Sequence, residues 1–115
     1  MRVITGLARG RKLREPEGMD IRPTTDMVKE SIFNIIQYDI EGRNALDLFA
    51  GTGQLGIEAL SRGAASVTFV DESASAIRLV KENLKLTGLP GGKTVYGDAL
   101  AFLERPGKFD LIFID

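Results

Sequence analysis

Three glycines and three acids are the residues of this sequence whose types and spacing could do chemistry. A short apolar run contains one acid, Asp47, and is followed by Gly51, Gly53 and Gly56, after which apolar residues recur at helical spacing. A strand, a glycine turn and a helix N-terminus in this order are typical of a nucleotide-binding loop, because glycine lets a ligand approach the backbone and the helix offers free N–H groups. With Asp71 about 20 residues further on, the spacing also matches the dinucleotide fingerprint.

Three carboxylates are expected along one edge of the predicted sheet. Asp47 lies in the first strand beneath the glycine loop, Asp71 ends the second strand, and Asp98 follows the third. Open α/β sheets bind ligands at the carboxyl ends of their strands, so the three acids predict one ligand site. Each acid taken singly could instead cap a turn or a helix. Their coincidence beside a glycine loop favours the ligand site.

The position of Asp47 helps to distinguish between the candidate ligands. A carboxylate under the loop would repel the pyrophosphate of a nicotinamide cofactor but would suit an ammonium group. Asp71 could accept hydrogen bonds from a ribose, and Asp98 could accept one from the amino group of adenine. Together they describe a nucleoside with an amine and no phosphate, which favours S-adenosylmethionine. A nicotinamide-dependent oxidoreductase stays open as the alternative.

The elements that must hold these residues alternate along the chain. The pattern predicts strands at 45–49, 66–70, 93–96 and 109–114, and helices at 54–62, 74–87 and 99–104. Repeated strand–helix–strand units imply right-handed crossovers and a mostly parallel sheet, so the expected fold class is α/β and Rossmann-like. The last strand is almost wholly apolar, as expected of a central strand buried on both faces. Because only Asp115 follows it, we expect the 115 residues to be the front part of a longer protein.

Upstream of the sheet the sequence predicts a β-hairpin and one helix. Residues 2–6 and 10–13 form two short strands, which need support from the body of the protein. A helix over 25–37 follows, with Lys29 on a face other than the apolar one. Its N-cap is Thr24 or Thr25, and its apolar stripe is Val28, Ile32, Ile35 and Ile36.

The formal net charge of −1 conceals a basic N-terminus. The first 14 residues hold no acid and five basic side chains, Arg2, Arg9, Arg11, Lys12 and Arg14. A basic arm on a near-neutral body is typical of a phosphate-contacting surface, and a solvated basic segment is the alternative.

Composition excludes several kinds of chemistry. The chain has no cysteine, hence no disulfide framework or thiolate, and no histidine, which removes the usual general base and the commonest zinc ligand. No apolar stretch approaches the roughly 20 residues of a membrane span, and the N-terminus lacks the apolar core of a signal peptide. We therefore expect a cytoplasmic protein without a bound metal.

Several stretches resemble one known family. The glycine loop from Asp47 to Gly53, the helix after it to Ala64, and the leader with Arg22-Pro23-Thr24-Thr25-Asp26 are similar to the RsmD-like methyltransferases. Members of that family methylate the exocyclic N2 amine of a guanine in 16S ribosomal RNA. The resemblance covers essentially the whole chain, and the leader is its most specific part. It implies a class I methyltransferase fold, with a basic arm at 1–20 and the first part of the methyltransferase domain at 21–115.

The resemblance also implies roles for individual residues. Gly51 and Gly53 would lie against the methionine part of S-adenosylmethionine, and Asp71 would hold the ribose hydroxyls. Asp98, with the N–H of Ala99, would bind adenine. Asp47 completes the expected cofactor site.

The catalytic motif of that family follows the fourth strand and reads Asp/Asn-Pro-Pro-Phe/Tyr. Asp115 would be its first residue, and the rest of the motif is absent from this chain. The implied partner is ribosomal RNA or a small-subunit assembly particle, contacted by Arg9, Arg11, Lys12, Arg14 and Arg22, and the implied full-length protein is a monomer. A non-catalytic RNA-binding module with the same fold is a further alternative.

Overall fold

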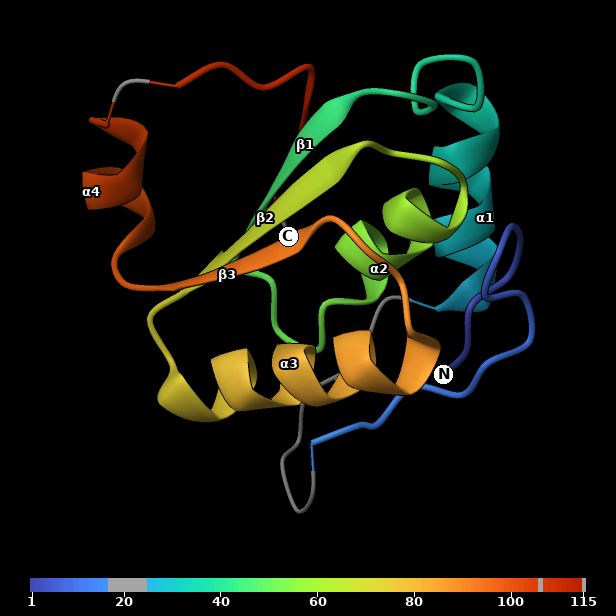
Figure 1. Cartoon of the computed structure of the whole chain (residues 1–115), viewed down its shortest axis with the longest axis horizontal. Coiled ribbons are helices and arrows are strands. Elements are labelled where there is room, and N and C mark those ends of the chain that lie inside the picture. Colours follow the sequence, from blue (N-terminus) through green and yellow to red (C-terminus); the bar gives the residue numbers. More distant parts are fainter. Residues whose placement is uncertain (17–24, 106, 115) are drawn as a thin grey trace.

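The computed structural model describes residues 1–16, 25–105 and 107–114 (Figure 1). Its centre is a four-stranded sheet in the order β3-β2-β1-β4, and every neighbouring pair is parallel. The strands are β1 (Asn44–Leu48), β2 (Ser66–Asp71), β3 (Gly92–Tyr96) and β4 (Leu111–Ile114). The helices are α1 (Asp26–Ile35), α2 (Gln54–Ser61), α3 (Ala74–Thr87) and α4 (Ala99–Leu103). The predicted α/β class with a parallel sheet is confirmed.

The helix ends lie where local chemistry places them. Helix α3 has the bounds that the sequence predicts, because Ser73 accepts a hydrogen bond from the N–H of Ala76 at its start and Gly88 takes the left-handed conformation after its end. Thr25 is the N-cap of α1, and its hydroxyl oxygen accepts from the N–H of Val28. Helix α1 ends at Ile35, earlier than predicted, and Ile36 is its C-cap.

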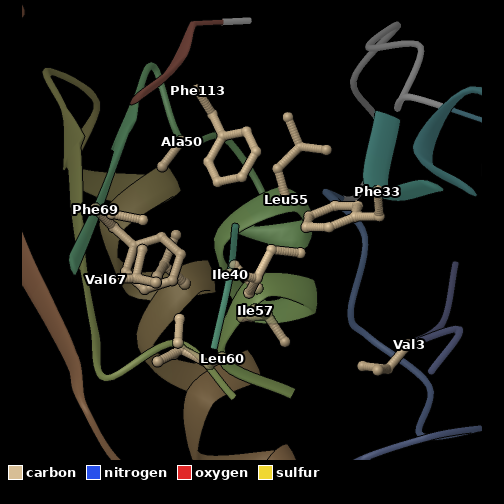
Figure 2. Close-up of a cluster of buried hydrophobic side chains, with 14 of the residues drawn as sticks. Val3, Phe33, Ile40, Ala50, Leu55, Ile57, Leu60, Val67, Phe69 and Phe113 are labelled. Atoms are coloured by element: carbon tan, nitrogen blue, oxygen red, sulfur yellow. The ribbon is translucent and has the colours of Figure 1, made fainter. Parts of the chain in front are cut away.

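Side chains on the two faces of the sheet form two apolar clusters. The larger cluster packs α1, α2 and α3 against one face, and Figure 2 shows Phe113 of β4 beside Leu55 and Phe33 within it. The smaller cluster joins Leu46 and Val70 to α4 on the other face. Residues of β1 alternate between these clusters, as the period of a strand requires.

The predicted apolar stripe of α1 is wrong at Val28 and Ile35, whereas Ile32 and Ile36 pack against the larger cluster as expected. Val28 is 49% exposed and Ile35 is 81% exposed, whereas Phe33 and the charged Lys29 are fully buried. The Phe33 ring packs 5.6 Å from that of Phe113, so an aromatic contact sets the rotation of the helix. Periodicity alone could not place Lys29 inside, because its burial depends on an acid in another helix.

The prediction for the fourth strand needs a correction as well. Strand β4 begins at Leu111, and within the described residues it has only β1 as a neighbour. Phe113 is buried, but Ile112 is 50% exposed and Ile114 is 72% exposed. Here β4 is therefore buried on one face and bordered on one side.

The N-terminal hairpin has fewer paired residues than predicted. A single antiparallel bridge joins Arg2 to Lys12, and the N–H of Val3 donates to the carbonyl of Arg11 at 2.9 Å. Its tip rests on the end of α2, where the hydroxyl oxygen of Ser61 accepts from the N–H of Ala8 at 2.9 Å. The expected support from the body of the protein is thus present.

Among the helices of the described residues, none has the length and apolar character of a membrane span.

Candidate functional site

The loop between β1 and α2 carries three left-handed residues within five positions. Gly51 and Gly53 have φ of 59° and 82°, and Phe49, which is not glycine, has φ of 58°. Left-handed backbone is costly for a residue with a Cβ and accumulates at functional sites. A Cβ on Gly51 would have no atom closer than the carbonyl oxygen of Phe49 at 4.0 Å, so this glycine borders open space. The loop is therefore tightly turned and accessible to a ligand beside Gly51.

Asp47 holds this loop from below. It pairs with Phe69 and Phe113 in the sheet, is 1% exposed, and its Oδ2 accepts a hydrogen bond from the N–H of Gly56 at 3.0 Å. That bond ties the first turn of α2 to β1 and complements the positive end of the helix dipole. A Cβ on Gly56 would overlap the Phe69 ring, so α2 lies very close to β2. The structure thus gives Asp47 a supporting position under the loop.

Asp71, at the end of β2, connects the loop to α3. Its Oδ2 accepts from the N–H of Gly51 at 3.1 Å, and its Oδ1 accepts from the N–H of Ser73 at 2.9 Å. The carboxylate is partly exposed, and each of its oxygens has a further lone pair for a ligand hydroxyl.

Asp98 lies beyond the end of β3 and is the N-cap of α4. It is exposed, and its Oδ2 accepts from the N–H of Ala101 at 3.1 Å. The N–H of Gly97 donates to the carbonyl of Asp71 at 3.0 Å, so the ends of β2 and β3 are joined. Ala99 follows and is buried. The acids therefore lie at the carboxyl ends of three adjacent strands, as the sequence predicts.

A cavity of about 560 Å³ opens beside Asp71 and the glycine loop. The N-terminal arm, the loop, the end of β2 and α3 all contribute to its walls. Of the predicted cofactor residues, Gly51 and Asp71 line it; Asp47, Gly53, Asp98 and Ala99 do not. The residues around it include Arg14, Glu15, Thr52, Asp71, Ser73, Arg78 and Glu82.

The predicted RNA-binding residues lie in two places. Arg9, Arg11 and Lys12 are exposed on the hairpin, while Arg14 lies at the cavity and its Nε is 3.7 Å from Oε2 of Glu82. Arg22, like the predicted catalytic residue Asp115, lies outside the described residues.

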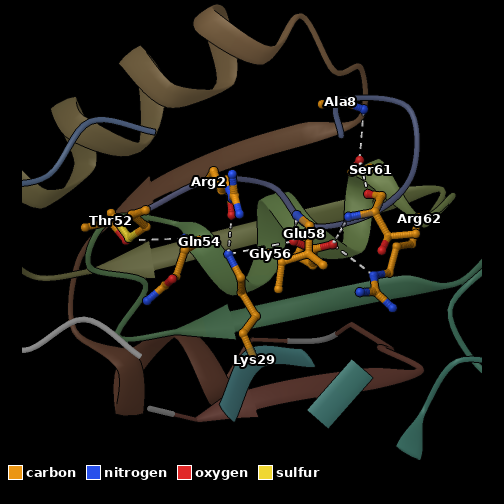
Figure 3. A network of polar contacts seen from close by, with 12 residues as sticks. Arg2, Ala8, Lys29, Thr52, Gln54, Gly56, Glu58, Ser61 and Arg62 are labelled. Carbon is orange, nitrogen blue, oxygen red and sulfur yellow. Dashed lines mark hydrogen bonds and ion pairs between the residues drawn. The ribbon is translucent and has the colours of Figure 1, made fainter. Parts of the chain in front are cut away.

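Sequence reasoning missed a buried charged cluster behind the site (Figure 3). Lys29 of α1 and Glu58 of α2 are both fully buried, with 3.7 Å between Nζ and Oε1. Nζ also donates to the carbonyl of Arg2 at 2.7 Å, and Glu58 accepts from the N–H groups of Ile4 and Thr5 and from Nε of Arg62. Burial lowers the pKa of Lys29 from its ordinary 10.5, and the charge of Glu58 opposes that shift. The cluster fastens the hairpin and α1 onto α2.

Asn83 is a second residue that sequence reasoning missed. It is fully buried, and its side-chain amide bonds the backbone of Arg14 and of Thr52. A signal was present in the sequence, because Asn83 interrupts the apolar stripe of α3 three residues after Val80.

The family model described as "Conserved hypothetical protein 95" matches residues 1–115, which is the whole chain. The chain belongs to this family. "Putative rRNA methyltransferase YlbH" of Bacillus subtilis is 50% identical over 120 residues, and the match covers 100% of this chain and 65% of that protein. "Ribosomal RNA small subunit methyltransferase D" of Escherichia coli is 38% identical over 116 residues, with 100% of this chain and 59% of that protein covered. These findings confirm the family resemblance seen in the sequence.

A solved structure agrees with the family assignment. "Putative methyltransferase yhhF" from Escherichia coli superposes with a TM-score of 0.89 at 38% identity, covering 99% of this chain and 62% of that one. The chain thus spans about three fifths of the length of these three proteins.

Within residues 1–16, 25–105 and 107–114, no three His, Cys, Asp or Glu side chains are grouped to hold a metal ion.

Proposed function

We propose that the protein transfers a methyl group from S-adenosylmethionine to the N2 amine of a guanine in small-subunit ribosomal RNA. The single observation that supports this most is the Asp71 carboxylate, held between the glycine loop and α3 at the wall of the cavity. Relatives whose names specify ribosomal RNA methyltransferases agree with it. The proposal includes action in the cytoplasm, where ribosomes are assembled, by a monomer whose basic arm is residues 1–20.

The described residues fit this cofactor. The open space beside Gly51 leaves room for a ligand against the backbone, and Asp71 has lone pairs left for a ribose diol. Asp98 and the N–H of Ala99 would bind adenine beyond the end of β3. Asp47 would act from beneath by fixing the loop through Gly56. When bound, the cofactor would supply an electrophilic methyl group.

The residues of the chain would position the acceptor amine. The N2 lone pair of guanine is delocalised into the ring, so the amine is a weak nucleophile. Asp115 would accept a hydrogen bond from its N–H, which localises the lone pair and orients it, and alignment supplies much of the rate. Arg9, Arg11 and Lys12 would bind phosphates of the RNA, with an affinity that falls as salt rises.

The replacement Asp71→Ala should weaken binding of S-adenosylhomocysteine by about 1.5–3 kcal/mol, or roughly 10- to 150-fold, since charge-assisted hydrogen bonds to the ribose are lost. Isothermal titration calorimetry measures the change. The neighbouring exposed acid provides a matched control, and Glu72→Ala should bind as the wild type does.

The same titration separates the two candidate cofactors. S-adenosylhomocysteine should bind and NAD should not, and the reverse result would favour the oxidoreductase alternative. Equal affinities in Asp71→Ala and wild type would remove the role given to Asp71.

A second prediction concerns the acceptor side. In the full-length protein, Asp115→Ala should abolish methyl transfer to unmethylated small-subunit RNA while leaving S-adenosylhomocysteine binding intact. Transfer of a radiolabelled methyl group measures the activity. Full activity in this variant would contradict the catalytic role of Asp115, and cofactor binding without any transfer by the wild type would favour a non-catalytic RNA-binding module.

A further inference from the structure

Helix α3 carries one buried polar side chain that the proposed reaction does not use. Asn83 is 0% exposed, and Nδ2 donates to the carbonyl of Thr52 at 2.9 Å and to that of Arg14 at 3.1 Å. Its Oδ1 accepts from the N–H of Arg14 at 2.7 Å. One side chain therefore joins α3, the glycine loop and the N-terminal arm.

These bonds need a primary amide. The two N–H groups of Asn83 serve two different carbonyls, and its oxygen serves the backbone N–H of one of the same residues. Aspartate would keep the acceptor and lose both donors, and leucine would lose all three bonds. Since a buried donor or acceptor left without a partner is costly, replacing this asparagine should loosen the arm at Arg14.

The two segments that Asn83 joins also line the same cavity. Arg14 and Thr52 both line the cavity beside Asp71. The side chain of Arg14 also contacts α3 through Glu82, but this is an exposed ion pair at 3.7 Å, which contributes little to stability. The amide of Asn83 therefore fixes the backbone of Arg14 on α3, next to Leu13, which is buried in the larger apolar cluster.

The arm also carries exposed positive charges on its hairpin, away from the cavity. Arg9, Arg11 and Lys12 are exposed on the hairpin, and only residue 13 separates Lys12 from Arg14. A polyanion bound to these side chains would restrain the same segment that Asn83 holds against the glycine loop. A ligand in the cavity would restrain that segment from the other side.

We propose that Asn83 is a positioning residue that couples RNA binding on the arm to cofactor binding in the cavity. This inference rests on the proposed function. Coupling of this kind is reciprocal, so RNA that orders the arm tightens cofactor binding, and the cofactor tightens RNA binding by the same factor.

Calorimetry on the full-length protein tests the coupling. Titrations with S-adenosylhomocysteine are made with and without a short RNA hairpin of small-subunit sequence. In the wild type the RNA should lower the Kd by at least about fivefold, and in Asn83→Leu this factor should fall to about one. Asn83→Asp should lose the factor too, because it lacks the donors. Lys85→Ala, an exposed change on the same helix, should keep it.

Hydrogen exchange in the wild type provides a readout that does not depend on how well a variant folds. Addition of S-adenosylhomocysteine alone should slow exchange of the Arg14 amide, because that N–H is bonded to Asn83. A coupling factor retained in Asn83→Leu, a wild-type factor of one, or unchanged exchange at Arg14 would each overturn the inference while leaving the proposed function standing. Absence of S-adenosylhomocysteine binding by the wild type would instead remove both.

Discussion

Replacing Glu58 by glutamine should lower the free energy of unfolding by about 3–5 kcal/mol, which is the usual effect of removing one partner of a buried ion pair. Glutamine keeps the length of the side chain and removes its charge. The ammonium of Lys29 would then stay buried without the charge of Glu58, still donating to the carbonyl of Arg2, and the N–H groups of Ile4 and Thr5 would face a weaker acceptor. Urea unfolding followed by circular dichroism measures the loss.

Two further variants show whether the loss comes from the pair. Glu104→Gln removes an exposed carboxylate and should change stability little. The double variant Lys29→Met/Glu58→Gln should recover part of the loss, because it no longer buries a charge without its partner. Wild-type stability in Glu58→Gln alone would contradict the account of this cluster.

The stability of the same variant should depend on pH, and the lowered pKa of Lys29 determines the direction of that dependence. Burial lowers the pKa of Lys29 below 10.5, and removing the charge of Glu58 should lower it further. Between the folded-state pKa and 10.5 the unfolded chain binds more protons than the folded one, so stability rises with pH in that window. The deficit of Glu58→Gln relative to wild type should therefore be largest below the folded-state pKa of Lys29 and should shrink as the pH rises toward 10.5. A deficit that does not vary with pH would exclude Lys29 as its source.

The second large effect is expected at a glycine of the N-terminal hairpin. Gly6 has φ of 95°, and a Cβ placed on it would overlap the backbone carbonyl of Ser61 in α2. The change Gly6→Ala adds backbone strain of about 1–2 kcal/mol to an overpacking cost of about 1–3 kcal/mol, so a total loss of about 2–5 kcal/mol is expected. It would also move the N–H of Leu7 away from the Ser61 carbonyl, to which it donates at 2.8 Å. Urea unfolding again gives the magnitude.

The hairpin contains its own matched control. Gly10 also lies in the left-handed region, with φ of 82°, but a Cβ there would meet nothing within 4 Å. Gly10→Ala should therefore lose only the strain, about 1–2 kcal/mol. The difference between the two variants measures how tightly the hairpin is seated on α2, and equal losses would mean that the contact with Ser61 is not limiting.

The variants at Glu58 and Gly6 change contacts of the N-terminal arm, and this arm connects the parts of the candidate site. Glu58 and Ser61 hold one end of it on α2, and Asn83 holds the other beside the glycine loop. Its arginines and the cavity consequently belong to one packed unit. A loosened arm should reduce RNA binding and cofactor binding together, which neither local change would do if the arm were only a solvated tail.

The sequence by itself determined the alternation of strands and helices and the order of the ligand-binding edge. Glycine spacing, caps and apolar runs are local signals, and they predicted the bounds of α3 and the carboxylates near the ends of β1, β2 and β3. The leader and the glycine loop together indicated the family, because their residue types are specific at fixed spacing.

Only the tertiary structure decided which polar residues lie inside. The sequence predicts Lys29 to be a surface residue of α1. Its burial requires Glu58, which is 29 positions away in another helix. The amide of Asn83 has a purpose only once Arg14 and Thr52 lie on either side of it. Ile112 and Ile114 likewise read as core, yet their exposure depends on what borders β4. Local patterns report the preferences of a segment, whereas the burial of a charge or an amide depends on partners that distant segments bring to it.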